Sequence, residues 1–470
     1  MSTLKKNIVY NFLYQLLILI LPLITAPYLA RVIGPQGVGV YSFSYSVAMY
    51  FTYITLLGLN NYGNRAIASV QDDYEKRSRV FCEIFAMQTM TFCISIALYL
   101  VYVGFFSVDK KAALIMLLWV LSSLFDINWF FFGMEQFKLT VTRNTIIKVL
   151  TVVAIFTFVK TKDDLYKYIA IMAVGIVLSQ MCLWPFLKKY IHFVKPKFKD
   201  VVKHFKPNLM LFVPVIAISL YKIMDKVMLG YISNMKQVAY YENAEKIINI
   251  TLAFITALGT VMLPRMTALI SAKREEESSK YLDDSVMLVA AYTNAVMFGI
   301  FAVAQRFAVW FYGDEFAKSG TVMMYLAVTT VLIGVGNVIR TQYIIPNKKD
   351  SIYIVSAIIG AVVNLIVNAL LIPHIASVGA AIGTIVAETC VFVYQIFCVR
   401  KDIHLLLYLK YEIVYIAIGA VMFGAIELLP VFKSDTVDLV LDVIVGATVY
   451  VLLAGLYIFL IKKKNLLHRS

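Results

Sequence analysis

Long apolar segments recur from one end of this chain to the other, and this pattern constrains the fold more than any other feature. A helix needs about 20 mostly apolar residues to cross a bilayer, and runs of that length repeat throughout the 470 residues. Hydrophobic residues make up 61% of the chain and charged residues only 15%, whereas a soluble protein carries roughly 25% charged residues. The sequence therefore predicts an all-α polytopic membrane protein.

About fourteen membrane-spanning helices are predicted, joined by connections too short to hold a large soluble domain. The first follows Lys5 and Lys6 and lacks a small-residue cleavage site before a polar mature region, so we interpret it as a retained helix and not as a signal peptide. The predicted spans are 8–31, 38–62, 80–104, 112–133, 144–160, 165–187, 208–232, 241–270, 285–310, 320–345, 351–372, 378–399, 411–432 and 436–461.

The distribution of Lys and Arg orients these helices. Of the 43 residues of these two types, 30 fall in connections on the side of the N-terminus and nine on the other side. Positive residues collect in cytoplasmic loops, so we expect both termini in the cytoplasm, which agrees with an even number of spans. The net charge of +15 follows the loops, and this distribution argues against nucleic acid as a partner.

The most basic connection divides the spans into six before it and eight after it. A sequence repeat supports two matching lobes, because residues 38–41 (VGVY) resemble residues 238–241 (VAYY). Such pseudo-symmetric repeats are a frequent transporter plan, with the substrate site in a central cleft between them. The predicted parts are an N-terminal six-helix lobe 1–187, a basic cytoplasmic linker 188–207, a C-terminal six-helix lobe 208–399, and two extra helices with a basic tail 400–470.

The seventh predicted span carries charges inside an apolar run. Lys222, Asp225 and Lys226 are three and four residues apart, so they share one helical face. Charges in lipid cost at least a few kcal/mol each, and they normally face a protein interior or a hydrated cavity. Two interpretations stay open: the lysines neutralise Asp225 or extend to the headgroups, or the three residues line a path for a substrate or ion.

A polar stretch closes the second span and ends near Arg65. It contains three Asn residues beside this Arg. Such a group could bind phosphate through charge-assisted hydrogen bonds, or it could cap the helix and anchor it on the positive side of the membrane.

No catalytic or metal site is predicted. Asp126 and Glu135 lie nine residues apart, a spacing that suits structural pairing with a basic residue better than paired acid–base catalysis. The five histidines are scattered, and the five cysteines lie within or at the edge of apolar segments without metal-ligand spacing. We therefore expect no metal, no cofactor and no disulfide framework.

Four motifs together resemble a known family. They are Lys6-Asn7…Tyr10-Asn11 through Pro27-Tyr28…Arg31-Val-Ile-Gly34, Tyr62-Gly63-Asn64-Arg65-Ala-Ile-Ala, Trp129-Phe-Phe-Phe-Gly-Met-Glu135 and Asp225-Lys226-Val-Met-Leu-Gly230. Over nearly its whole length the chain resembles the bacterial polysaccharide or oligosaccharide flippases, the Wzx-type transporters of the multidrug/oligosaccharidyl-lipid/polysaccharide exporter superfamily. The resemblance implies a V-shaped bundle of two six-helix lobes that works by alternating access in the bacterial plasma (inner) membrane.

The resemblance also implies the cargo, an undecaprenyl-diphosphate-linked oligosaccharide repeat unit for surface polysaccharide synthesis. By the family's architecture, helices one, two, seven and eight line the cleft. Lys222 and Lys226 are our candidates for headgroup charge, with Asp225 as their partner or as an ion-coupling carboxylate. Arg31 and Arg65 are further substrate-binding candidates near opposite mouths. A proton or sodium gradient and polysaccharide polymerase machinery are further partners consistent with this family.

Three alternatives stay open. A multidrug or cation antiporter of the same superfamily would be expected to show acidic cavity groups, whereas the seventh span is net positive. A membrane polysaccharide polymerase or polyprenyl-dependent glycosyltransferase would need catalytic residues on a sizeable outer loop, and the predicted outer loops are short. A purely structural membrane scaffold is disfavoured by the buried charges. We therefore expect a transporter and not an enzyme.

Overall fold

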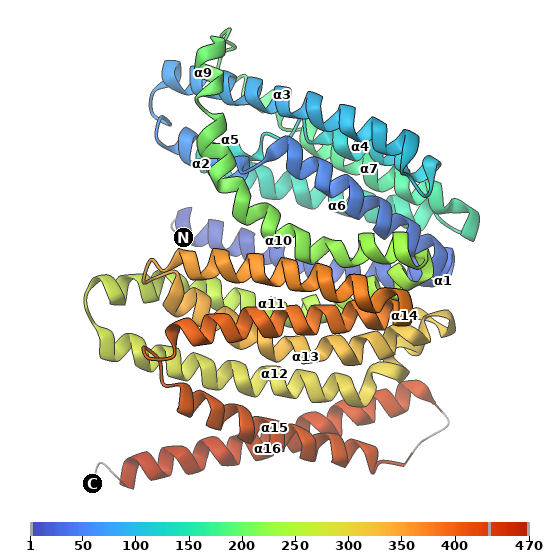
Figure 1. Cartoon of the computed structure of the whole chain (residues 1–470), viewed down its shortest axis with the longest axis vertical. Helices are drawn as coiled ribbons and strands as arrows, with labels where there is room; N and C mark the ends of the chain where they lie inside the picture. The colour runs from blue at the N-terminus through green and yellow to red at the C-terminus, as the bar shows by residue number, and fades with distance from the viewer. Residues whose placement is uncertain (1–2, 431–433, 468–470) are drawn as a thin grey trace. The chain divides into compact units, whose positions relative to one another are not determined.

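The computed structural model describes residues 3–430 and 434–467, and within these residues it consists of helices and connecting turns (Figure 1). The description leaves out the side chains of residues 3–20, 214, 217, 218, 220–222 and 461–467. The α-helices are α1 (Thr3–Leu56), α2 (Leu59–Ala68), α3 (Tyr74–Phe105), α4 (Lys110–Ser122), α5 (Asn128–Gly133), α6 (Phe137–Phe158), α7 (Leu165–Met181), α8 (Trp184–Leu187), α9 (Phe198–Val202), α10 (Phe205–Ile232), α11 (Met235–Ser271), α12 (Glu275–Tyr312), α13 (Ala317–Ile339), α14 (Asp350–Val399), α15 (Leu405–Glu427) and α16 (Asp435–Leu467). Three short helices, η1 (Lys162–Asp164), η2 (Asp314–Phe316) and the π-helical η3 (Arg340–Ile344), join them.

The helices confirm a polytopic all-α membrane protein. Among the described residues, nine helices are long and apolar enough to cross a bilayer. Two long helices, α1 and α14, each contain one non-helical residue that divides them into two parts. With this division, most predicted spans fall on one helix or on one part of a divided helix. The exceptions are 38–62, 112–133, 165–187 and 320–345, each of which extends over two consecutive helices.

The division of α1 follows from its sequence. Gly34 has φ 67° and ψ 179°, and Pro35 follows it. Glycine tolerates a positive φ that costs other residues strain, and proline offers no N–H to continue the helical ladder. The turn predicted between 8–31 and 38–62 therefore lies at Gly34. In α14 the non-helical residue is Ala376, in the gap predicted between 351–372 and 378–399.

The chain divides by contacts into two compact units, Met1–Ala239 and Tyr240–Ser470. Helix α10 therefore belongs to the N-terminal unit, where it contacts α1, α2 and α9. The domain boundaries predicted from the sequence, with the second lobe beginning at residue 208, stay a prediction.

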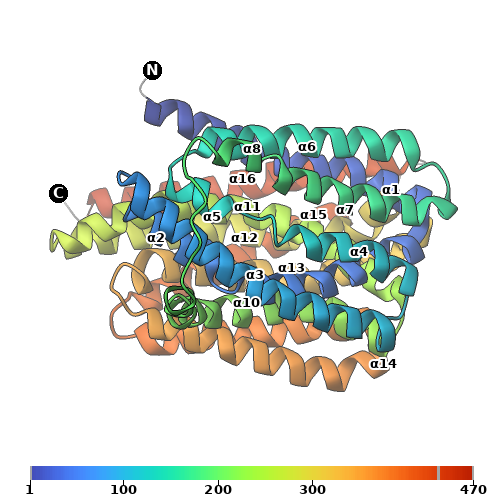
Figure 2. The ribbon, with the colours of Figure 1, turned by 90° about the horizontal axis from the view of Figure 1, so that it is seen from above.

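In the N-terminal unit, α7 lies between α4 and α6 and contacts both (Figure 2). An aromatic core fixes the end of this unit that holds α2, α3 and α5. Trp129 stacks on Phe81 with ring centroids 5.4 Å apart, and its indole N–H donates to Gln88 Oε1 at 3.1 Å. A side chain at Gly63 would collide with the Trp129 ring, so this glycine lets α2 approach α5 closely.

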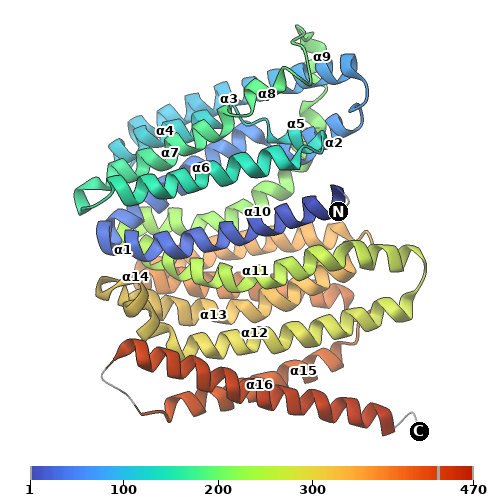
Figure 3. The same ribbon diagram turned by 180° about the vertical axis from the view of Figure 1, so that it is seen from behind.

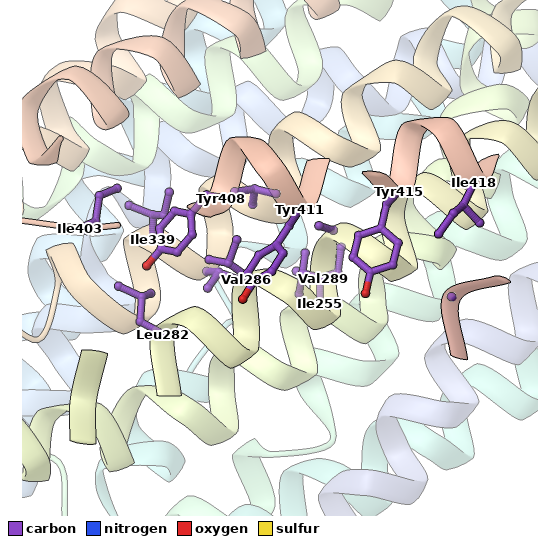
Figure 4. Packing of buried hydrophobic residues seen from close by; sticks show 14 of the residues in the cluster. Ile255, Leu282, Val286, Val289, Ile339, Ile403, Tyr408, Tyr411, Tyr415 and Ile418 are labelled. Carbon is purple, nitrogen blue, oxygen red and sulfur yellow. The ribbon is translucent and has the colours of Figure 1, made fainter. Parts of the chain in front are cut away.

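In the C-terminal unit, α12 contacts α13, α15 and α16. Tyr408, Tyr411 and Tyr415 lie three and four residues apart on one face of α15, and they point toward the helix that carries Leu282 and Val286 (Figure 4). Their rings form part of a buried apolar cluster. This packing attaches the thirteenth predicted span to the ninth.

Candidate functional site: a charged helix packed on α1

The predicted charged face lies on α10, and the structure brings it against α1. Asp225 is buried, with 2% of its surface exposed, and Lys226 is half-buried. Tyr50 of α1 lies close enough to both residues to interact with them electrostatically. The side chain of Lys222 lies outside the described residues, so its role in binding the headgroup stays a prediction.

Close contacts between helices show that α10 runs antiparallel to the second part of α1. At one end, Gly58 lies against the carbonyl oxygen of Asn208, which a side chain at that glycine would approach within 2.6 Å. At the other end, a side chain at Gly230 would overlap the ring of Phe43. Figures 1 and 3 show the two helices side by side. Asp225 and Lys226 lie between these two contacts.

The same packing continues into the start of α11. A side chain at Gly39 would overlap the carbonyl group of Met235, so the backbones of α1 and α11 touch there. Gly39 and Gly230 both occur in the sequence motifs that we singled out. Their role in this structure is steric: each removes a side chain where two helices meet.

The two arginine candidates lie beyond opposite ends of this part of α1. Arg31 is exposed and precedes the break at Gly34 by three residues, and Arg65 is exposed in the last turn of α2. The helical segment between them holds about 20 residues and is therefore roughly 30 Å long. The structure thus places Tyr50 beside Asp225 and Lys226, which are neighbours in the chain, and keeps Arg31 and Arg65 beyond opposite ends of this part of α1.

Sequence reasoning missed a buried polar network at the start of α10. His204 Nε2 lies 2.9 Å from Glu83 Oε2, and His204 Nδ1 lies 2.6 Å from the hydroxyl of Tyr62. Both His204 and Glu83 are almost fully buried. Lys203 Nζ lies 3.3 Å from the same carboxylate. The sequence offered no signal for this contact, because Glu83 and His204 are 121 residues apart.

The network has an electrostatic consequence for Lys203, which lies in the connection between α9 and α10. Partial burial lowers the pKa of Lys203, but the carboxylates of Asp200 and Glu83 outweigh that effect and raise the pKa above its ordinary value. The lysine therefore stays charged and ties the end of the basic connection to α3.

A second polar cluster includes Asp126. The Arg143 guanidinium donates to the carbonyl of Ser179 at 2.9 Å and to Asn128 Oδ1 at 2.9 Å. Asn128 in turn donates to Asp126 Oδ1 at 2.7 Å, and Arg143 interacts electrostatically with that carboxylate. Asp126 is thus held structurally beside a basic residue.

Comparison with known proteins identifies the family. A family model described as polysaccharide biosynthesis protein matches residues 4–270, more than half of the chain. The chain belongs to this family. Among relatives, it is 22% identical over 401 residues to a candidate O-antigen transporter of Shigella dysenteriae, covering 84% of this chain and 100% of that one. It is 24% identical over 245 residues to a candidate flippase of low-salt glycan biosynthesis from Haloferax volcanii, covering 52% and 51% of the two chains.

Solved structures show which known proteins share this fold. The inward closed conformation of the lipid II flippase MurJ superposes with a TM-score of 0.76 at 15% identity, covering 96% of this chain and 98% of that one. An inward-facing transporter of the multidrug resistance MATE family gives a TM-score of 0.59 at 15% identity, covering 82% and 99%. The chain therefore shares its fold with both proteins.

Proposed function

We propose that this protein is a flippase that moves lipid-linked oligosaccharides from one leaflet of the membrane to the other. Family membership supports this proposal, as do relatives named for O-antigen transport and glycan flipping. The cargo that we propose is an undecaprenyl-diphosphate-linked repeat unit for surface polysaccharide synthesis. We propose the bacterial inner membrane as its location, with both termini in the cytoplasm, and transport in place of catalysis as its activity.

One observation links the proposal to particular residues: Asp225 is buried beside Lys226 within a mostly apolar helix. A diphosphate and its sugars are too polar to enter hydrocarbon unaided. A hydrated path along α10 would supply positive charge from Lys222 and Lys226 to the diphosphate, while the polyprenyl chain stays in lipid. Tyr50, which lies near Asp225 and Lys226, would face the same path from α1.

Two alternative roles are open to Asp225 within this proposal. It balances the two lysines when no cargo is bound, or it takes up the proton or sodium ion whose gradient drives the return step. Arg31 and Arg65, exposed beyond opposite ends of the second part of α1, would attract the diphosphate at the two mouths. Polysaccharide polymerase machinery would receive the cargo on the far side.

The test is export in a strain that lacks the gene. We expect lipid-linked repeat units to accumulate on the cytoplasmic leaflet, and the intact gene to restore surface polysaccharide. The double variant Lys222→Gln, Lys226→Gln should reach the membrane in normal amounts but fail to restore export. Lys236→Gln is the matched control, because Lys236 is an exposed lysine at the start of α11, and it should restore export fully.

Asp225→Asn separates the two roles of the carboxylate. If Asp225 only balances charge, the variant should retain part of the export, since the lysines still attract a diphosphate. If Asp225 couples transport to an ion, gradient-driven export should stop while the cargo still binds. Full export by the double lysine variant would overturn the assignment of the headgroup site.

A further inference from the structure

A pocket of about 720 Å³, lined mostly by polar residues, lies within the C-terminal unit, at the end where α11 meets α12 and α14 meets α15. Its volume falls in the usual range of small-molecule sites, about 300–1,000 Å³. The Lys and Arg distribution assigns this end to the cytoplasm, the side from which the proposed cargo enters. The lining residues are Met266, Ile270, Glu275, Glu276, Ser278, Ser279, Lys280, Leu282, Asp283, Gln342, Tyr343, Asn347, Asp402 and His404.

Gln342 is the residue that points to a ligand. It lies in the π-helical turn η3, and its side chain is fully buried. Within the described part of the chain, neither its amide nitrogen nor its amide oxygen has a hydrogen-bond partner. A buried amide without partners destabilises a fold, and π-helical turns often occur at functional sites. Gln342 lies at the lining of the pocket with its amide enclosed, so a polar molecule that bound there and reached the amide would satisfy its two donors and its acceptor.

The charges of the pocket restrict what that molecule can be. Asp283 accepts a hydrogen bond from the Tyr408 hydroxyl at 2.8 Å and lies 2.9 Å from His404 Nδ1. Asp402 lies 2.7 Å from the ammonium group of Lys349. These two carboxylates are thus already compensated by neighbouring side chains.

The remaining charged lining residues are on exposed positions. Glu275 and Glu276 begin α12, and Lys280 follows them one turn later. Carboxylates outnumber lysines in the lining, so a diphosphate would be repelled. A neutral molecule that donates and accepts many hydrogen bonds fits the paired carboxylates, the amide and the phenol of Tyr343. Tyr408, Leu282, Ile339 and Ile403 form an apolar wall beside this region (Figure 4).

We propose that this pocket binds a sugar residue of the cargo, so that the C-terminal unit recognises the oligosaccharide. This inference rests on the proposed function, because that function identifies the lipid-linked cargo as the molecule that carries the sugar. Gln342 supplies the central hydrogen bonds to sugar hydroxyls, and Asp283 and Asn347 act as further polar contacts. The pocket would thereby select among repeat units by the sugar that they carry.

The experiment measures binding to the purified full-length protein in detergent by ligand-observed NMR. The probes are the methyl glycosides of glucose, galactose and N-acetylglucosamine, with inorganic diphosphate and spermidine as anionic and cationic comparisons. We expect at least one glycoside to bind. Gln342→Leu should weaken that binding about tenfold or more, because a site built to hydrogen-bond a hydroxyl loses that contact.

Thermal stability separates a binding role from a structural one. The free Gln342→Leu protein should melt no lower than the original, because the replaced amide has no partners to lose. Gln395→Leu is the matched control. Gln395 is another buried glutamine of this unit, but its amide donates to Ser356 Oγ at 2.8 Å. This control should melt at a lower temperature and bind the glycoside unchanged.

Several results would overturn the inference. They are binding of none of the glycosides, equal binding by Gln342→Leu, and binding of diphosphate or spermidine in the place of a sugar. The export assay distinguishes failure of the sugar-site inference from failure of the flippase proposal. If the gene is needed for export but no glycoside binds, only the sugar site fails. If the gene is dispensable for export but Gln342-dependent binding persists, the flippase proposal fails and the pocket remains a sugar site.

Discussion

A methyl group added at Gly230 should disturb the contact that holds α10 against α1. The Cβ of Gly230→Ala would overlap the ring of Phe43, and Phe43 is buried with 1% of its surface exposed. The ring also packs edge-to-face on Tyr231, with centroids 5.2 Å apart, which limits its freedom to move. Either the ring or the helix must therefore shift.

Two opposing effects determine the magnitude. Alanine is favoured over glycine inside a helix by about 1 kcal/mol, whereas overpacking a tight contact costs about 1–3 kcal/mol. Because the overlap at Phe43 is severe, we expect a net loss of about 1–2 kcal/mol. For a unit of 239 residues, that loss lowers Tm by roughly 2–8 °C. Thermal unfolding of the purified protein in detergent measures it.

A size exchange tests the cause. Phe43→Leu alone should destabilise by about 1 kcal/mol or more, since it leaves a cavity. The double variant with Gly230→Ala should recover part of that loss, because the new methyl group occupies the space, with a coupling energy of about 1 kcal/mol. Export should fall in Gly230→Ala, since the shift displaces Asp225 and Lys226 relative to Tyr50, and should recover in the double variant.

Gly104→Ala is the control for helix propensity. Gly104 lies in α3 with nothing within 4 Å of an added Cβ, so this variant should be equal in Tm to the original protein or more stable. A Gly230→Ala protein as stable as Gly104→Ala would refute the close approach of α10 to α1. Strictly additive effects in the size exchange would refute direct contact between the two residues.

Three further predictions follow from the polar contacts. His204→Leu should destabilise by about 3 kcal/mol or more, because it leaves the buried Glu83 carboxylate without its nearest partner, whereas the double variant with Glu83→Leu should recover much of the loss in thermal unfolding. The Lys349 ammonium lowers the pKa of Asp402, so this carboxylate stabilises the fold at neutral pH and the contribution is lost as pH falls through its folded-state pKa. Lys349→Met should therefore make the fall in Tm below about pH 4 less steep. The loss in free energy of unfolding at neutral pH should be less than about 1 kcal/mol, because both groups are partly exposed. Arg143→Lys should unfold at a clearly lower temperature than the original protein, since a single ammonium group cannot make the forked contacts to Ser179 and Asn128, and an unchanged Tm would contradict the role assigned to that fork.

The sequence alone determined the features that depend on neighbouring residues in the chain. Hydrophobic runs of spanning length predicted where the helices lie, because a bilayer requires about 20 apolar residues for each crossing. Gly34 followed by Pro35 accounts for the break in α1 through backbone sterics and a missing N–H. The spacing of Lys222, Asp225 and Lys226 likewise indicated one charged helical face before any packing was known.

The tertiary structure decided which helices meet and which polar groups they bury. No local pattern in the sequence pairs Gly230 with Phe43 or His204 with Glu83, because periodicity reports the faces of a single helix and not its neighbours. Gln342 shows the same limit, since its place near the end of a predicted span says nothing about its hydrogen-bond partners. Only the folded chain removes its amide from water without giving it a partner, and that burial makes it a candidate for binding.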